Sequence, residues 1–94
     1  MSRVAVAVLA IALAAAAELA QAQPRFVALP ANDLVYDAVR QRLYASVPSS
    51  AGARGNTVTA IDPFTGTIGA SVFVGSEPGR LELSDDGQFL YVGL

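Results

Sequence analysis

Two hydrophobic patterns divide the chain near residue 22. Residues 4–17 are apolar without interruption, whereas from about residue 34 apolar and polar residues alternate in short runs. Segments rich in glycine and proline separate those runs. Alternation with a period of two is typical of strands that bury one face. The pattern predicts an apolar leader followed by an all-β, antiparallel segment.

The first 22 residues have the layout of a helical signal peptide. Arg3 precedes the apolar run, and Ala20-Gln21-Ala22 supplies the small residues that signal peptidase accepts. A retained membrane anchor is the alternative, but the run is shorter than the roughly 20 residues of a spanning helix. Glu18 would also be costly inside a membrane. We therefore expect export to the periplasm or the cell exterior, without a stable membrane anchor.

The alternating part of the chain predicts six strands. Residues Ile68, Ala70, Val72 and Val74 are expected on one face of the fourth strand. Asp62, Pro63 and Gly66 are turn-forming residues, and residues 84–87 form a second turn signal. The predicted strands cover residues 34–37, 42–47, 57–61, 67–74, 81–83 and 89–94.

An internal repeat accompanies these strands. A shift of 47 residues places 34–47 over 81–94, pairing Leu43 with Leu90 and Tyr44 with Tyr91 in the same alternation phase. One period contains four strands, which is the size of one β-propeller blade. A small free-standing meander is the alternative.

The order of motifs resembles the YVTN repeat of YncE-like β-propellers. The resemblance runs from Asn56 to Val92: a strand ending in Ile-Asp, a Thr-Gly turn, Val-Gly-x-x-Pro, and Ser-x-Asp-Gly before Leu-Tyr-Val. Asp85 stands where that family usually has proline, and Gly93 and Leu94 replace its Thr-Asn. The resemblance implies that residues 23–94 begin a propeller, with about one blade and part of a second. The chain is then expected to be the amino-terminal fragment of a longer protein.

Two functions are compatible with this resemblance. The first is an exported, noncatalytic propeller that serves as a binding or interaction scaffold for a protein or polymer. The second is a lactonase-like propeller enzyme whose reactive groups come from blades outside this chain. Because propellers host both classes, the fold does not choose between them.

Composition removes several kinds of chemistry. The chain has no cysteine and no histidine, which excludes thiol nucleophiles, Ser-His triads and histidine-based zinc sites in this segment. Asp85 and Asp86 favour a turn over a calcium loop, because the spaced oxygen ligands of an EF-hand are missing. Glu77 and Glu82 are interpreted as surface groups. We expect no catalytic, cofactor-binding or metal-binding residue here.

Charge and loop composition do not favour nucleic acid. The net charge is -2, and Arg40 and Arg42 fall between two strands, as in a turn. Residues 48–55 predict a flexible loop without a phosphate-binding motif; a propeller rim where ligands dock is the alternative. Three aromatic residues in strands are expected to pack rather than to stack on a ligand: Tyr44, Phe89 and Tyr91.

The leader generates a prediction about processing. Because Ala20-Gln21-Ala22 follows the apolar run, the exported protein is expected to begin at Gln23. Intact-mass analysis of exported material checks this. A mass that still includes residues 1–22 would contradict it.

The repeat generates a prediction about folding. Residues 23–94 alone are expected to lack a stable cooperative fold and to self-associate through strand edges near Leu90, Tyr91 and Val92. Ordering costs on the order of 1.5 kcal/mol per residue, which burial of one blade face at roughly 25 cal/mol per Å2 does not exceed. Size-exclusion elution and urea melts at several concentrations check this. A monomer with one sharp, concentration-independent transition would be the opposite result.

Overall fold

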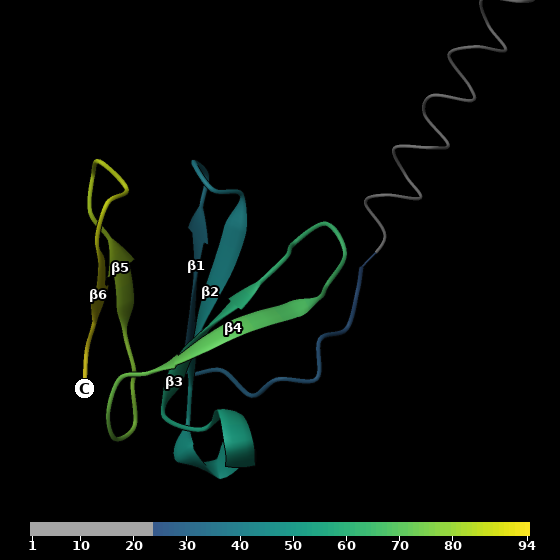
Figure 1. Ribbon diagram of the computed structural model, residues 1–94, viewed down its shortest axis with the longest axis vertical. Helices are drawn as coiled ribbons and strands as arrows, with labels where there is room; N and C mark the ends of the chain where they lie inside the picture. Colours follow the sequence, from purple (N-terminus) through teal and green to yellow (C-terminus); the bar gives the residue numbers. More distant parts are fainter. Residues whose placement is uncertain (1–23) are drawn as a thin grey trace, which may run out of the picture.

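The computed structural model describes residues 24–94, so the predicted signal peptide lies outside the described residues. Strands are the main regular elements of the described part, and Figure 1 shows how they are arranged. These elements are β1 (Asp33–Asp37), β2 (Arg42–Val47), the 3-10 helix η1 (Ser49–Arg54), β3 (Thr57–Ile61), β4 (Ile68–Phe73), β5 (Leu81–Leu83) and β6 (Leu90–Val92). All six predicted strands are present, although β4 and β6 are shorter than expected.

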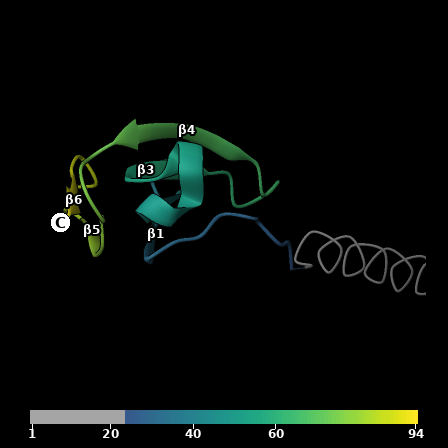
Figure 2. The same ribbon diagram turned by 90° about the horizontal axis from the view of Figure 1, so that it is seen from below.

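The first four strands form one antiparallel sheet in the order β1-β2-β3-β4. β5 and β6 form a separate antiparallel hairpin. The all-β, antiparallel prediction is confirmed. Figure 2 shows this hairpin on one side of the sheet, while residues 24–31 approach from the other side.

The register of the strands gives the sheet two distinct faces. Directly opposed residues share a face. Leu43 opposes Ile61 and Ala45 opposes Thr59, which places them on what we call the core face. Tyr44 opposes Ala60 and Val58 opposes Val72, which places them on what we call the hairpin face. Both faces carry apolar side chains.

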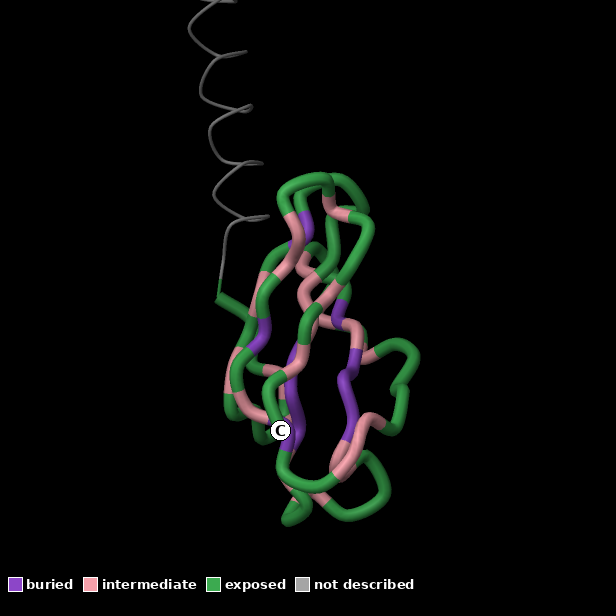
Figure 3. Tube along the Cα trace, turned by 90° about the vertical axis from the view of Figure 1, so that its left-hand side faces the viewer, coloured by how far each residue is buried: buried purple, intermediate pink, exposed green. Residues whose placement is uncertain are grey.

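A small core forms on the core face at the centre of the sheet. Ala45 and Val47 are fully buried, and Ile61 is 6% exposed. Val27 and Leu29, from the segment that precedes β1, pack against this core. Figure 3 shows the buried positions in the strands, with exposed turns around them. Residues 24–31 therefore supply a partial cover for this face.

Hydroxyl groups extend the buried part of the core face. Thr57 Oγ1 lies 2.9 Å from Thr59 Oγ1, which lies 2.7 Å from Ser71 Oγ. Thr57 Oγ1 also donates to the carbonyl oxygen of Arg54 at 2.6 Å. Among residues 24–94, every buried side-chain nitrogen or oxygen has a hydrogen-bond partner. Burial of the Thr57 and Thr59 hydroxyls therefore leaves no unpaired group, which would be costly.

One prediction about β4 is wrong at Ile68. Thr59 opposes Ser71 and Ile61 opposes Ile68, so two residues of β4 stand against Ala60 alone. Such a β-bulge reverses the alternation beyond it. Ile68 therefore shares the core face with Ile61, whereas Ala70 and Val72 lie on the hairpin face.

The predicted turn residues act as expected. Asp62 Oδ1 accepts a hydrogen bond from the Phe64 N–H at 2.8 Å, and the Gly66 N–H donates to the Asp62 carbonyl oxygen at 2.8 Å. Gly66 has a φ of 74° and Gly87 a φ of 70°, the left-handed region that favours glycine. These two glycines close the β3–β4 and β5–β6 turns.

The loop at residues 48–55 is more regular than its composition predicts. Two short turns make up η1: the Ala51 N–H donates to Pro48 O at 3.1 Å, and the Gly55 N–H donates to Gly52 O at 2.9 Å. Gly52, with a φ of 73°, joins them. The loop that was predicted to be flexible therefore contains a short helix, which local hydrogen bonds and the packing of Ala51 on the core hold in place.

Candidate functional site

A groove of about 830 Å3 lies between the hairpin face of the sheet and the β5–β6 hairpin. Apolar side chains form most of it, and polar groups gather at one end. The apolar lining comprises Tyr44, Val58, Ala60, Ala70, Val72, Val74, Leu83, Phe89, Leu90 and Val92. Asp37, Arg40, Arg42 and Gln88 lie at the polar end. We take this groove as the candidate site, because it combines an apolar lining with polar groups at one end.

Polar contacts hold the β5–β6 hairpin and the segment before it against the sheet. Asn32 Nδ2 donates to Pro78 O at 2.8 Å, and Ser46 Oγ donates to Gly79 O at 2.6 Å. The Leu81 N–H donates to Asp33 Oδ2 at 2.9 Å. These bonds fix the spacing and orientation of the two walls of the groove.

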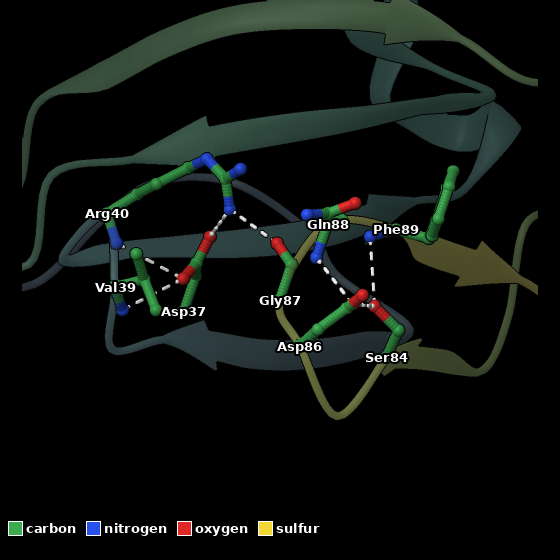
Figure 4. Close-up of polar contacts among 8 residues, drawn as sticks. All are labelled: Asp37, Val39, Arg40, Ser84, Asp86, Gly87, Gln88 and Phe89. Atoms are coloured by element: carbon green, nitrogen blue, oxygen red, sulfur yellow. Dashed lines mark hydrogen bonds and ion pairs between the residues drawn. The ribbon is translucent and has the colours of Figure 1, made fainter.

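Asp37 and Arg40 form the polar end of the groove (Figure 4). The Asp37 side chain is only 2% exposed. Its Oδ1 accepts hydrogen bonds from the Val39 and Arg40 N–H groups at 3.0 and 3.2 Å. Arg40 Nη1 lies 2.9 Å from Asp37 Oδ2 and donates to Gly87 O at 2.6 Å. One guanidinium nitrogen therefore joins the β1–β2 turn to the β5–β6 turn.

This ion pair favours the charged form of both partners. The Arg40 side chain, through its hydrogen bond, lowers the pKa of Asp37, although burial opposes the shift. The same hydrogen bond raises the pKa of the Arg40 guanidinium. The pKa of Asp33 is also lowered, chiefly by the hydrogen bond from the Leu81 N–H. These carboxylates are held ionised as hydrogen-bond acceptors, which makes them poor general acids.

The carboxylates named from the sequence lie in turns and on the surface. Asp86 Oδ1 accepts hydrogen bonds from Ser84 Oγ at 2.6 Å and from the Gln88 N–H at 3.1 Å, and these lower its pKa. Asp85 and Glu82 are exposed. Glu77 is exposed as well, and its carboxylate accepts hydrogen bonds from the Ser49 N–H and hydroxyl, which ties the β4–β5 connection to η1.

The aromatic residues divide between the groove and the surface. Tyr44 is partly buried and lines the groove, as packing predicts. Phe89 also lines the groove but remains 60% exposed. Tyr91, which pairs with Glu82 of β5, is 60% exposed as well. Arg42 is exposed at the start of β2. Among the described residues, Tyr44 alone of the three is partly buried, and the packing of Phe89 and Tyr91 stays a prediction.

Sequence reasoning missed the residues that join the four-stranded sheet to the β5–β6 hairpin and the segment before it. Asn32, Asp33 and Ser46 carry these bonds, yet each is a common surface residue type. The available signal was the repeat: a shift of 47 residues pairs Arg40 with Gly87, and these two positions are in contact. Stacked repeats bring equivalent positions together, so the spacing could have predicted this contact.

Neither metal-site nor membrane-helix features occur in the described residues. Residues 24–94 contain no group of three or more His, Cys, Asp or Glu side chains placed to hold a metal ion. Within the same range, no helix has the length and apolar character needed to cross a membrane.

Comparisons with known proteins add no relative. No family model matches the chain, and neither a curated protein nor a solved structure matches it.

The Asp37–Arg40 pair generates a prediction about pH. A carboxylate whose pKa is lower in the folded state stabilises that state above its unfolded pKa of about 3.9, and this contribution is lost as the pH falls through the folded pKa. Asp37→Asn is therefore expected to lower resistance to urea at neutral pH, with the difference from the unaltered chain disappearing in acid. Circular dichroism of the sheet during urea titration at several pH values measures this.

Asp85→Asn is the matched control, because the Asp85 side chain accepts none of the hydrogen bonds found in the described residues. It is expected to leave the sheet signal that the chain retains in urea at neutral pH unchanged. Equal effects of the two substitutions would contradict a specific role for the buried pair.

Proposed function

We propose that this chain is an exported, noncatalytic segment of β-propeller repeats that serves as a binding or interaction scaffold for a protein or polymer. Its four-stranded sheet is one blade, and its β5–β6 hairpin begins the next. The proposal assigns the described side chains to stacking and to surface recognition, and no catalytic role to any of them. The resemblance to YncE-like proteins provides its functional class.

The observation that carries the proposal is the way the hairpin meets the sheet. Under the 47-residue shift, Leu90 and Val92 are the counterparts of Leu43 and Ala45, which lie on the core face. The side chains of Leu90 and Val92 nevertheless line the groove, on the side opposite the hairpin face of the sheet. The core-type face of the second unit thus lies across the groove from the hairpin face of the first.

This contact is head to tail, because two different surfaces of equivalent units meet. A head-to-tail contact can be repeated by each further unit, and it closes into a ring when the rotation permits. Three of the four bonds that hold residues 78–87 against the sheet region follow the same spacing: Asn32 to Pro78, Arg40 to Gly87 and Asp33 to Leu81 span 46, 47 and 48 residues. Such regularity is typical of stacked repeats and supports the proposal over a free-standing meander.

Tandem arrays of the unit test the proposal. Genes that encode two, three, four or more copies of residues 33–79 in series should produce proteins whose melting temperature rises with each added unit. The expected rise is at least about 4 °C per unit, the shift that roughly 1 kcal/mol produces in a small domain. A melting temperature independent of unit number would favour independent meanders and contradict the proposal.

Two arginine substitutions in every unit of the array sharpen the test. Arg40→Ala removes the bond to Gly87 and should reduce the gain per unit. Arg42→Ala removes a neighbouring exposed arginine that makes no such bond in the described structure, and should leave the gain unchanged.

A further inference from the structure

The β5–β6 turn contains the single Asp-Gly pair of the chain, formed by Asp86 and Gly87. An aspartate before glycine is open to a backbone rearrangement, because glycine has no Cβ to shield its nitrogen. The Gly87 nitrogen can then reach the side-chain carbon of Asp86, Cγ, and close a five-membered ring. Asp86 is exposed, so water reaches its carboxyl group. The turn therefore holds a candidate site of covalent change.

The rearrangement needs no oxidant, reductant or co-reactant besides water. In its first step the Gly87 nitrogen bonds to Asp86 Cγ, and the hydroxyl of the protonated carboxyl group leaves with the proton of the nitrogen as water. The product is a cyclic imide. In the second step water opens the ring at either of its two carbonyl carbons. Opening at the main-chain carbonyl leaves Gly87 joined to the former side chain, and this product is isoaspartate.

The closed turn holds both reacting groups away from this reaction. The Gly87 N–H donates to Ser84 O at 2.9 Å, which keeps its proton in a hydrogen bond. Asp86 Oδ1 accepts hydrogen bonds from Ser84 Oγ at 2.6 Å and from the Gln88 N–H at 3.1 Å, as Figure 4 shows. These bonds lower the pKa of Asp86 and so favour the carboxylate, which lacks the hydroxyl that must leave. Reaction therefore requires the turn to open.

Arg40 holds the same turn from the side of the sheet. Its Nη1 donates to Gly87 O at 2.6 Å and lies 2.9 Å from Asp37 Oδ2. A Cβ placed on Gly87 would lie 3.6 Å from Val39 Cγ2, so the β1–β2 turn lies close to Gly87 as well. Releasing Gly87 from the closed turn therefore breaks its bond with Arg40.

We propose that Asp86–Gly87 is a site of spontaneous isomerisation to isoaspartate, and that closure of the turn on Arg40 sets its rate. The reaction proceeds from the open turn, in which water replaces the bonds to the Gly87 N–H and the Asp86 carboxylate. The site goes beyond the proposed function and does not depend on it.

Isomerisation changes the contact between the hairpin and the sheet permanently. In isoaspartate the main chain runs through Cβ and Cγ of residue 86, which makes it longer by one carbon atom. The Gly87 carbonyl then no longer lies where Arg40 Nη1 meets it. Because refolding does not reverse a covalent change, chains that open are gradually converted into chains whose hairpin lacks this bond.

The site is tested without any need for a stable fold. The exported chain is incubated at neutral pH in water enriched in oxygen-18, digested, and analysed by liquid chromatography with mass spectrometry. Isoaspartate should accumulate at position 86 and carry solvent oxygen, because hydrolysis of the imide adds it. Asp33, Asp37 and Asp62 are internal controls and should stay unchanged. The residues that follow them carry a Cβ, and Pro63 has no N–H to lose.

Control by the turn is tested by comparing two quantities measured in the same sample. A synthetic peptide of residues 80–94, which lacks Arg40, gives the isomerisation rate of an open turn. The rate in the full chain, divided by the rate in the peptide, should equal the open fraction that amide exchange reports at the Gly87 N–H. Sulfate favours compact states and should lower both quantities, whereas urea should raise both. The relation holds at any stability, including the low stability expected for residues 23–94 alone.

Two arginine substitutions provide a matched pair. Arg40→Ala removes the bond to Gly87 O and should raise the isomerisation rate in sulfate by about fivefold or more, the effect of losing one hydrogen bond to a charged group. The open fraction should rise with it. Arg42→Ala removes an exposed arginine that makes no such bond in the described structure, and should leave both quantities unchanged.

Four outcomes would overturn the proposal. The first two are absence of isoaspartate at position 86 and equal isomerisation at every aspartate. The third is a chain that reacts at the peptide rate while amide exchange reports a closed turn. The fourth is a Gly87 amide that stays unprotected even in sulfate, because Arg40 would then exert no control. The tandem arrays of residues 33–79 lack residues 84–87, so the proposed function stands or falls separately.

Discussion

The register between β2 and β3 is the constraint on which the rest of the structure depends. A slip by one residue would exchange every side chain between the two faces. In the observed register, Ala45 and Ile61 lie on the core face, while Tyr44 and Val58 lie on the hairpin face. Because both faces are apolar, the sheet needs a covering layer on each side. Residues 24–31 and η1 contribute one layer, and the β5–β6 hairpin contributes part of the other.

Polar groups fix the position of the β5–β6 hairpin on the apolar face of the sheet. Apolar packing alone would tolerate several positions of a short hairpin on a flat sheet, because it is not directional. The bonds from Asn32, Ser46 and Arg40 to backbone carbonyls of residues 78–87 select one position. Asp37 in turn holds the Arg40 guanidinium by an ion pair. The groove keeps its shape because these bonds place its walls, and its floor stays open because the hairpin is only two strands wide.

Local chemistry explains why so much of the secondary structure could be predicted. Asp62 and Gly66 close a turn by bonds within five residues, and alternation marks the strands on either side. Ile68 escaped this reasoning because the bulge opposite Ala60 changes the phase of β4, and a bulge depends on the partner strand. The order in residues 48–55 also escaped it, because Glu77, more than twenty residues away, anchors Ser49.

By itself, the sequence determined the strand positions, the turns, the 47-residue spacing and the lack of cysteine and histidine chemistry. Those properties depend on neighbouring residues and on composition, which a linear pattern records. Only the tertiary structure decided that Asp37 is buried beside Arg40 and that Arg40 reaches Gly87, across 47 residues. The groove between Val58, Val72 and Leu90 was decided there as well. Contacts between two packed layers depend on the distance and angle between them, and no local run of residues specifies those quantities.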